Sequence, residues 1–326
     1  MCSEAPLSLQ RLSTALVVVF GLVLTTAGPR AQTPAAPAQK PKITMAGYPA
    51  PGETAKLTVL ATGAEPKKAL RYNIPATFKG RVEMVTSMNM TMNMMGQSME
   101  MAVPAIKMGI DLAVTGVAPN GDISYSMAFS SMTVEGDASN PLVMQMQAAS
   151  ATITGVKGTT SMTNRGLTKD SNLDVADPAT KAMLGQMTSS VENLLPAFPE
   201  EAVGVGARWE VRQAISAAEQ TQFQKAVYEI TAISGTSVSL KVTTENTAPP
   251  QPINAALAAA AGGEMMLDKM SGTGTGTMTV SLDSLTPTTS VAQTSSTAMT
   301  MNIQGQSMSI ASDGKISVTV KPVKLP

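Results

Sequence analysis

The chain has 326 residues, and its 23 basic and 23 acidic side chains give a formal net charge of zero. This balance argues against nucleic acid and anionic membrane surfaces as partners, since both require a basic excess. The chain has no histidine and one cysteine, and aromatic residues make up only 3% of it. These counts exclude Ser-His-Asp catalysis and imidazole-ligated metal sites.

Residues 1–31 are predicted to be a secretory signal peptide. A basic residue precedes the apolar run at 15–24, and small residues follow it, with cleavage expected after Ala27 or Ala31. The apolar run is shorter than the roughly 20 residues that a membrane-spanning helix needs. Cys2 lies before the run, so no cysteine is placed to carry a lipid anchor. We therefore expect a secreted or periplasmic protein without integral membrane insertion.

The next segment, 32–56, is rich in alanine and proline and is predicted to be a disordered tether. Everything from 57 to 326 is then expected to form a single β domain, because no composition shift marks a second boundary. All-β domains of this length are ordinary.

The most regular pattern in the chain runs from Met88 to Met94, where every second residue is methionine and the others are small and polar. Strict alternation predicts a β-strand with one apolar and one polar face. The segment from Met90 to Met101 resembles the segment from Met299 to Ile310, with eight of twelve residues identical. Both copies predict a hairpin, and the two hairpins could be neighbours in one sheet.

Other hairpin turns are predicted at three glycine-containing sites, Pro119–Asp122, Ser234–Thr236 and Ser312–Lys315. Further strands are expected at 151–163, 208–217, 276–284 and 290–303. The glycine-rich stretch Gly272–Gly276 leads into a strand rather than a helix, which argues against a phosphate loop and predicts a bent strand entry.

A helix is predicted at about 178–195. Asp177 supplies an N-cap, Pro178 suits the first helical position, and the apolar residues that follow share one face. A shorter helix is possible at 141–149. The predicted fold class is therefore mainly β: a single large curved antiparallel sheet or open barrel with an inserted helix. The lack of aromatic girdles argues against an outer-membrane barrel.

No constellation in the sequence predicts an enzyme, a resident metal or a cofactor. The adjacent carboxylates Glu200 and Glu201 follow a proline and are expected to be solvated in a loop. Catalytic residues are predicted to be absent.

Two motifs resemble a family of uncharacterised bacterial secreted proteins and lipoproteins. One is Ala69-Leu70-Arg71-Tyr72, and the other is Leu195–Trp209, a proline-rich turn followed by Val-Gly-Val-Gly and a tryptophan. The resemblance covers roughly residues 57–322 and implies no particular activity. More loosely, strands with an inserted helix are similar to half-barrel lipoprotein carriers. That likeness implies a concave apolar sheet that holds acyl chains.

The methionines lead to the functional hypothesis. Unbranched, polarizable thioethers suit adaptable apolar surfaces, so we expect a non-enzymatic protein that binds an apolar ligand, such as a lipid, or an apolar partner. Two alternatives are a structural envelope protein without a ligand, and Cu(I) binding by thioethers alone. The predicted lining residues are Met88, Met90, Met92, Met94, Met99, Met101, Met299, Met301 and Met308.

Overall fold

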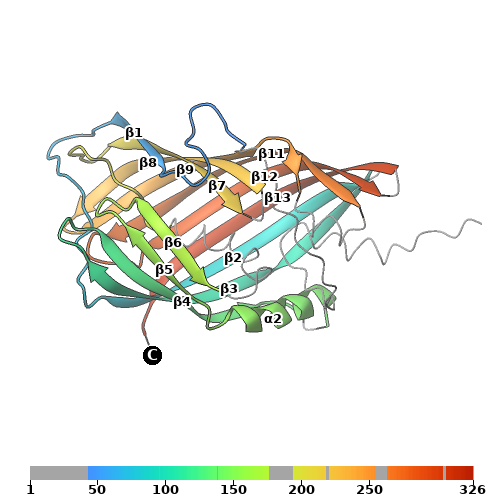
Figure 1. The fold of residues 1–326 in the computed structure, drawn as a ribbon, viewed down its shortest axis with the longest axis horizontal. Coiled ribbons are helices and arrows are strands. Elements are labelled where there is room, and N and C mark those ends of the chain that lie inside the picture. Colours follow the sequence, from blue (N-terminus) through green and yellow to red (C-terminus); the bar gives the residue numbers. More distant parts are fainter. Residues whose placement is uncertain are drawn as a thin grey trace, which may run out of the picture.

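The computed structural model describes residues 43–94, 96–137, 139–175, 194–217, 220–253, 263–303 and 306–325. Within these ranges, thirteen strands form one antiparallel sheet with a single helix beside it (Figure 1). The predicted fold class is confirmed. The elements are β1 (Lys56–Ala61), β2 (Lys79–Met94), β3 (Gln97–Val117), β4 (Ile123–Val134), α2 (Pro141–Ile153), β5 (Lys157–Met162), β6 (Thr168–Asp174), β7 (Arg208–Ala217), β8 (Gln220–Ser234), β9 (Ser237–Ala248), β10 (Gln251–Pro252), β11 (Glu264–Ser281), β12 (Thr288–Ile303) and β13 (Gln306–Val323).

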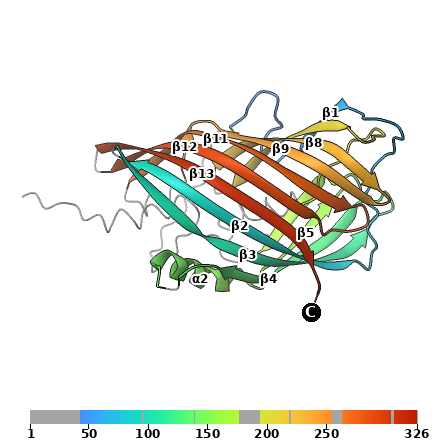
Figure 2. The ribbon, with the colours of Figure 1, turned by 180° about the vertical axis from the view of Figure 1, so that it is seen from behind.

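The sheet follows the order β1-β7-β8-β9-β11-β12-β13-β2-β3-β4-β5-β6, and β10 pairs with β11 beside this path. Its ends are β1 and β6, and no ladder joins these two strands in the described ranges, so the sheet is open. The sheet wraps into a long trough, with β7 to β13 along one wall and β2 to β6 along the other (Figures 1 and 2). It therefore has an inner, concave face and an outer face.

The two similar hairpins are neighbours, as the sequence suggested. β12 and β13 form one hairpin, β2 and β3 form the other, and β13 pairs with β2 along its length. Their registers are equivalent. Met90 lies opposite Met101 and Met299 lies opposite Ile310, and one step nearer the tip the pairs are Met92 with Met99 and Met301 with Met308.

The turn at Asn120-Gly121 lies between β3 and β4 as predicted, and Gly121 has a positive φ of 84°. The turn predicted at Ser312–Lys315 is wrong, because β13 runs straight through it. Gly314 lies on the inner face opposite Met90, and both neighbouring strands pair with this segment. Paired strands on both sides satisfy the backbone there, which overrides the local turn preference.

A second correction concerns Gly272–Gly276. This stretch is the middle of β11, in register with β9 and β12, and is not a strand entry. A Cβ on Gly274 would lie 2.5 Å from Gln293 Cγ and 2.6 Å from Thr244 Oγ1. Gly274 therefore gives room to inner-face side chains of both adjacent strands.

The helix in the described residues is α2. It includes all of the shorter helix predicted at 141–149 and continues beyond it. It continues to Ile153, which is fully buried, so the strand predicted from 151 begins only at Lys157. The helix predicted at 178–195 lies outside the described residues except for Leu194 and Leu195, which form a bend. Residues 1–42 also lie outside these ranges.

Residues 43–55, which belong to the predicted tether, form turns over the outer face of the sheet. The ring of Tyr48 lies 5.3 Å from the ring of Phe223 on β8, in an edge-on arrangement. The guanidinium of Arg212 lies 5.3 Å from the centre of the same tyrosine ring. An aromatic contact and a cation–π contact thus hold this segment against β7 and β8.

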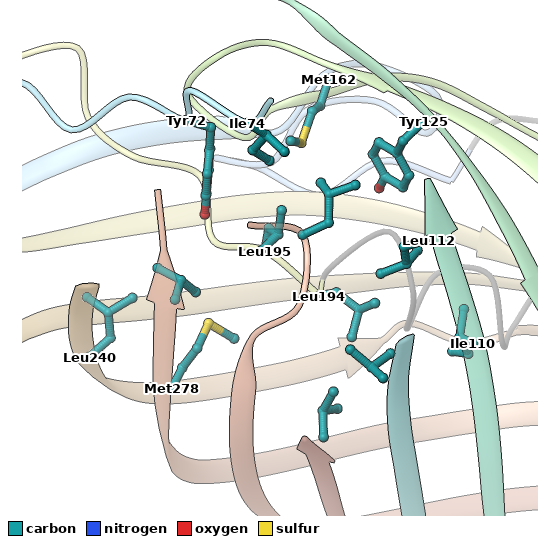
Figure 3. Packing of buried hydrophobic residues seen from close by; sticks show 14 of the residues in the cluster. Tyr72, Ile74, Ile110, Leu112, Tyr125, Met162, Leu194, Leu195, Leu240 and Met278 are labelled. Carbon is teal, nitrogen blue, oxygen red and sulfur yellow. The ribbon is translucent and has the colours of Figure 1, made fainter. Parts of the chain in front are cut away.

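The larger apolar core fills one end of the trough, where loop residues insert between the walls. In Figure 3, Tyr72, Leu194 and Leu195 lie between Leu240 and Met278 on one side and Ile110 and Leu112 on the other.

Hydrogen bonds join the segments Ala69–Tyr72 and Leu195–Trp209 at this core. Tyr72 Oη donates to the Pro196 carbonyl at 3.1 Å, and Trp209 Nε1 donates to the Ala197 carbonyl at 2.8 Å. Arg71 reaches the carbonyl oxygens of Pro199 and Glu200. The two motifs are therefore one packing unit.

Candidate ligand-binding face

Nine buried apolar side chains cluster at the hairpin end of the inner face. We call this group, together with Met101, Met270 and Ile303 packed on it, the thioether cluster. Met90 and Met92 come from β2, and Met299 and Met301 from β12; all four are at most 6% exposed. The other buried members are Ala248, Ile253, Met265, Leu267 and Ile310.

The structure thus brings together five of the nine predicted lining residues: Met90, Met92, Met101, Met299 and Met301. The predicted alternation is confirmed around them, since Met90 and Met92 are buried while Asn89 and Asn93 are exposed.

The other predicted lining residues do not belong to the thioether cluster as described. Met99 lies opposite Met92, but its side chain is 53% exposed, because it is close to the hairpin tip. Met88 and Met308 are half-buried. The backbone of Met94 is paired in β2, and its side chain lies outside the described part of the structure.

Sequence reasoning missed the contribution of β11. Met265 lies opposite Met301 and Leu267 lies opposite Met299, so β11 supplies a third row of the cluster. The alternation there is interrupted by a bulge between Leu267 and Lys269 and then by inner-face glycines. Continuing the period-2 pattern backwards from Met278 through the glycines to Met270 would have revealed this strand.

A row of neutral polar side chains separates the thioether cluster from the larger core. Cross-strand pairing aligns Gln213, Gln224 and Asn246 with Gly272, Ser295 and Gly314, and the same row ends at Met90 and Met101 on the opposite wall. Adjacent rows add further residues. We call the whole set the polar belt: Gln213, Gln224, Thr244, Asn246, Gln293, Ser295, Thr297 and Ser312.

The belt is more open than the apolar groups on either side of it. Ser312 and Thr244 are buried, whereas the other six side chains are half-buried. Gln213 Nε2 donates to Gln224 Oε1 at 2.7 Å, and Gln293 Nε2 donates to Thr244 Oγ1 at 3.2 Å. The belt therefore presents both donors and acceptors to the interior of the trough.

Charge is confined to the other face. Every inner-facing position of the described strands is uncharged, while the ion pairs of the sheet lie outside. Glu83 accepts from Lys107 and Lys321 on the two neighbouring strands, and these contacts lower the pKa of its carboxyl. Arg81 binds both carboxylate oxygens of Asp111 and lowers the pKa of that group.

The described depressions are also on the outer face. The larger one, about 990 Å³, runs across six strands between two rows of mostly small polar side chains. One row includes Thr273 and Thr294, and the other includes Ser271 and Ser296. The nine buried members of the thioether cluster are at most 6% exposed.

The described inner-facing side chains of the belt and the thioether cluster offer apolar contact, neutral hydrogen bonds and thioether coordination. The described residues contain no group of three histidine, cysteine or acidic side chains that could hold a metal ion. Glu200 and Glu201 are exposed, and the Glu200 carboxylate lies 3.5 Å from Arg165. No described helix is both long and apolar enough to cross a bilayer.

No protein-family model matches the chain, and no curated protein matches it. Two solved structures are similar over much of their length. A mutant of the Rh. blastica porin is 10% identical, with a TM-score of 0.23, over 76% of this chain and 100% of that one. An outer membrane channel from Pseudomonas putida F1 is 9% identical, with a TM-score of 0.15, over 77% and 97%. At these scores, the likeness supports no conclusion about function.

Proposed function

We propose that this chain is a non-enzymatic extracytoplasmic protein that binds an apolar ligand, such as a lipid, at the thioether cluster. The observation that carries the proposal is the contrast between the two apolar groups. The larger core contains the rigid rings of Phe129, Phe198 and Trp209, whereas the thioether cluster has no aromatic residue and is dominated by methionine. Rigid side chains fit one packing, while unbranched thioethers adapt to variable alkyl shapes.

Ligand entry requires the methionines to change rotamer, because the buried side chains of the cluster are at most 6% exposed. Methionine has three flexible side-chain torsions, so such a change is easier here than in a branched or aromatic core. Met101 and Met270 are only partly buried and lie at the margin of the cluster, beside the more open polar belt. An alkyl chain entering from the belt would meet these two residues first.

The absence of acidic and basic side chains from the inner-facing positions of the described strands supports a binding role over catalysis. General acid–base chemistry needs a titratable group within hydrogen-bond reach of the reacting atom. The inner-facing positions of the described strands carry no acidic or basic side chain, their tyrosines Tyr125 and Tyr228 belong to the larger core rather than to the thioether cluster, and the chain contains no histidine.

The test is binding of a fluorescent alkyl-chain alcohol to the mature protein, with Met101→Gln and Met270→Gln as site variants. Glutamine keeps the length of the side chain and removes its apolar character, so each variant should weaken binding by about tenfold, or 1.4 kcal/mol. Met144→Gln is the matched control, because Met144 is 52% exposed on α2. It should leave binding unchanged. No probe binding to the folded protein would assign the cluster to a closed structural core.

A second candidate, Cu(I) binding, is favoured by the register of the β2–β3 hairpin. Met90 lies opposite Met101 and Met92 lies opposite Met99, so four methionines occupy adjacent inner-face positions, although Met99 is 53% exposed. Soft sulfur ligands suit Cu(I), and same-face neighbours along a strand are roughly 7 Å apart. Long side chains can therefore converge on one ion.

Competition with a chromophoric Cu(I) chelator tests this candidate. Sub-micromolar uptake that persists at acidic pH and disappears in the double variant Met99→Leu, Met101→Leu would support it. The matched control replaces Met108 and Met132, an opposed pair in the larger core, with leucine. No uptake, or equal loss in both double variants, would reject a site at the hairpin.

A further inference from the structure

The charge pattern of the trough narrows the class of ligand. Along the inner face, the polar belt offers only amide and hydroxyl groups, and no inner-facing position of the strands that the structure describes carries a charge. The arginine, lysine and acidic side chains of the same strands alternate to the outer face, as Glu245, Asp313 and Lys315 do around the belt residues Asn246 and Ser312.

Among the described residues, a charged ligand group on the belt would meet no counter-ion on the inner face. Moving an ion from water into a partly dry site without a partner is costly, whereas a neutral polar group needs only hydrogen bonds. Glutamine and asparagine side chains supply two donors and an acceptor each, and serine and threonine supply one donor and an acceptor. Hydroxyl, ester and amide groups are the natural complements of this set.

The distance between the belt and the thioether cluster fits an alkyl chain. Ser295, Met299 and Met301 share the inner face of β12. From the rise per β-residue, the two methionines lie roughly 13 and 20 Å beyond the serine. One leaflet of a bilayer has a hydrocarbon depth of about 15 Å, half of the full core. A lipid chain starting at the belt therefore ends within the cluster.

We infer that the ligand is an uncharged amphiphile, whose neutral head group binds the polar belt and whose single alkyl chain lies along the thioether cluster. This inference rests on the proposed function and specifies its ligand. It assigns a role to the belt that a purely apolar ligand would leave unexplained, because polar side chains at these positions would then oppose the chain they contact. Gln224, Asn246 and Ser295 are the central head-group residues of the row.

The experiment compares three ligands with the same sixteen-carbon chain, each below its critical micelle concentration. They are a neutral monoacylglycerol, the anionic fatty acid at pH 8, and a cationic alkyl trimethylammonium. Displacement of the fluorescent alcohol from the mature protein gives the three affinities. The monoacylglycerol should bind at least about tenfold more tightly than either charged ligand, a difference of 1.4 kcal/mol.

Two variants locate the head group. Ser295→Asp places a carboxylate within the belt and should weaken monoacylglycerol binding at least tenfold. Thr294→Asp adds the same charge to the adjacent outer position and should change the affinity less than twofold. Because aspartate on an inner strand can impair folding, Ser295→Asn provides a neutral variant that should retain the preference for the uncharged ligand. Far-UV circular dichroism and urea midpoints identify which variants are folded.

The outcomes separate the two claims. Binding of the fatty acid or the cation as tightly as the monoacylglycerol would overturn the head-group assignment and leave the apolar site in place. Equal effects of Ser295→Asp and Thr294→Asp in folded protein would also overturn it. If neither the fluorescent alcohol nor any of the three ligands binds, the proposed function itself fails.

Discussion

The side chain of Gln251 makes the hydrogen bonds to the Thr221 backbone that a neighbouring strand would otherwise make. Its Oε1 accepts from the Thr221 amide at 2.7 Å, and its Nε2 donates to the Thr221 carbonyl at 2.8 Å. The strand β9 leaves the ladder at Ala248, before two prolines, and would otherwise expose the backbone of β8 there. Gln251 is only 2% exposed, so the glutamine amide completes the sheet in a buried position beside the thioether cluster.

Replacing Gln251 with alanine should destabilise the protein by about 2–4 kcal/mol, because three side-chain hydrogen bonds are lost, two to Thr221 and one to the Pro249 carbonyl, and the Thr221 backbone groups are left unpaired. Urea denaturation followed by circular dichroism measures the change. Gln306→Ala, at an exposed position in β13, is the control and should stay within about 0.5 kcal/mol of the wild type. Equal stability of the two variants would show that the amide has no special role.

Replacing Gly276 with alanine should lower the free energy of unfolding by about 1–3 kcal/mol, because overpacking forces neighbouring groups to move. A Cβ there would collide with the carbonyl oxygen of Ser290 and with Val291 on β12. Gly116→Ala is the matched control in another strand, since its Cβ would meet nothing within 4 Å. It should be neutral or stabilising by up to about 1 kcal/mol. Similar urea midpoints for the two variants would contradict close strand approach at Gly276.

Stability should fall at alkaline pH. Burial raises the pKa of Tyr228 to about 12, against an unfolded value of 10.0, and also raises the pKa of Tyr72. A pKa that is higher in the folded protein than in the unfolded chain means that folding favours the neutral phenol. The stabilisation is therefore fully present below pH 10 and is lost as the pH rises towards 12. The loss from Tyr228 is at most about 2.7 kcal/mol, since its ring is partly exposed.

Urea midpoints measured from pH 9 to pH 12 test this dependence. Tyr228→Phe should reduce the slope without abolishing it, because Tyr72 still titrates on unfolding. Tyr228 stacks on Trp209, with ring centres 5.6 Å apart, and phenylalanine preserves that contact. An unchanged slope in the variant would mean that other groups cause the alkaline loss.

Glu83 should stabilise the folded protein at neutral pH but not at low pH. Lys107 and Lys321 lower its carboxyl pKa below the usual 4.5, so the stabilisation is present above pH 4.5 and is lost as the pH falls through the lowered value. Because both lysines are well exposed, Glu83→Gln should cost only about 0.5–1 kcal/mol at pH 7 and less in high salt. The control is Glu264→Gln at the exposed start of β11. Equal differences at pH 7 and pH 3 would contradict the ion-pair explanation.

The sheet, its hairpins and the position of Met90 and Met92 could be predicted from sequence, because period-2 alternation directly reports which face a side chain occupies. The repeated methionine pattern also indicated that β12–β13 and β2–β3 are equivalent. By contrast, Gly314 follows an aspartate in a local turn pattern, and only pairing on both sides shows that its strand continues.

The polar belt could not be predicted, because its residues look solvent-facing within any single strand. Asn246 and Ser295 share the inner face only through the register of three strands, with Gly272 between them. Register depends on pairings far apart in the sequence, which one sequence does not reveal. The same dependence on register explains why the thioether cluster was predicted only in part. The methionines of the two hairpins were visible as alternating patterns, whereas the position of Met265 depends on the β11–β12 register.

Native mass spectrometry of the mature protein, purified gently from its own host without detergent, most directly tests whether the trough binds an apolar ligand. We predict a bound mass in the range of a single-chain neutral lipid, released as an uncharged species on collisional activation and reduced in Met101→Gln but not in Met144→Gln. Repeated spectra of the folded protein without any bound mass, together with no uptake of the monoacylglycerol added afterwards, would contradict the proposal.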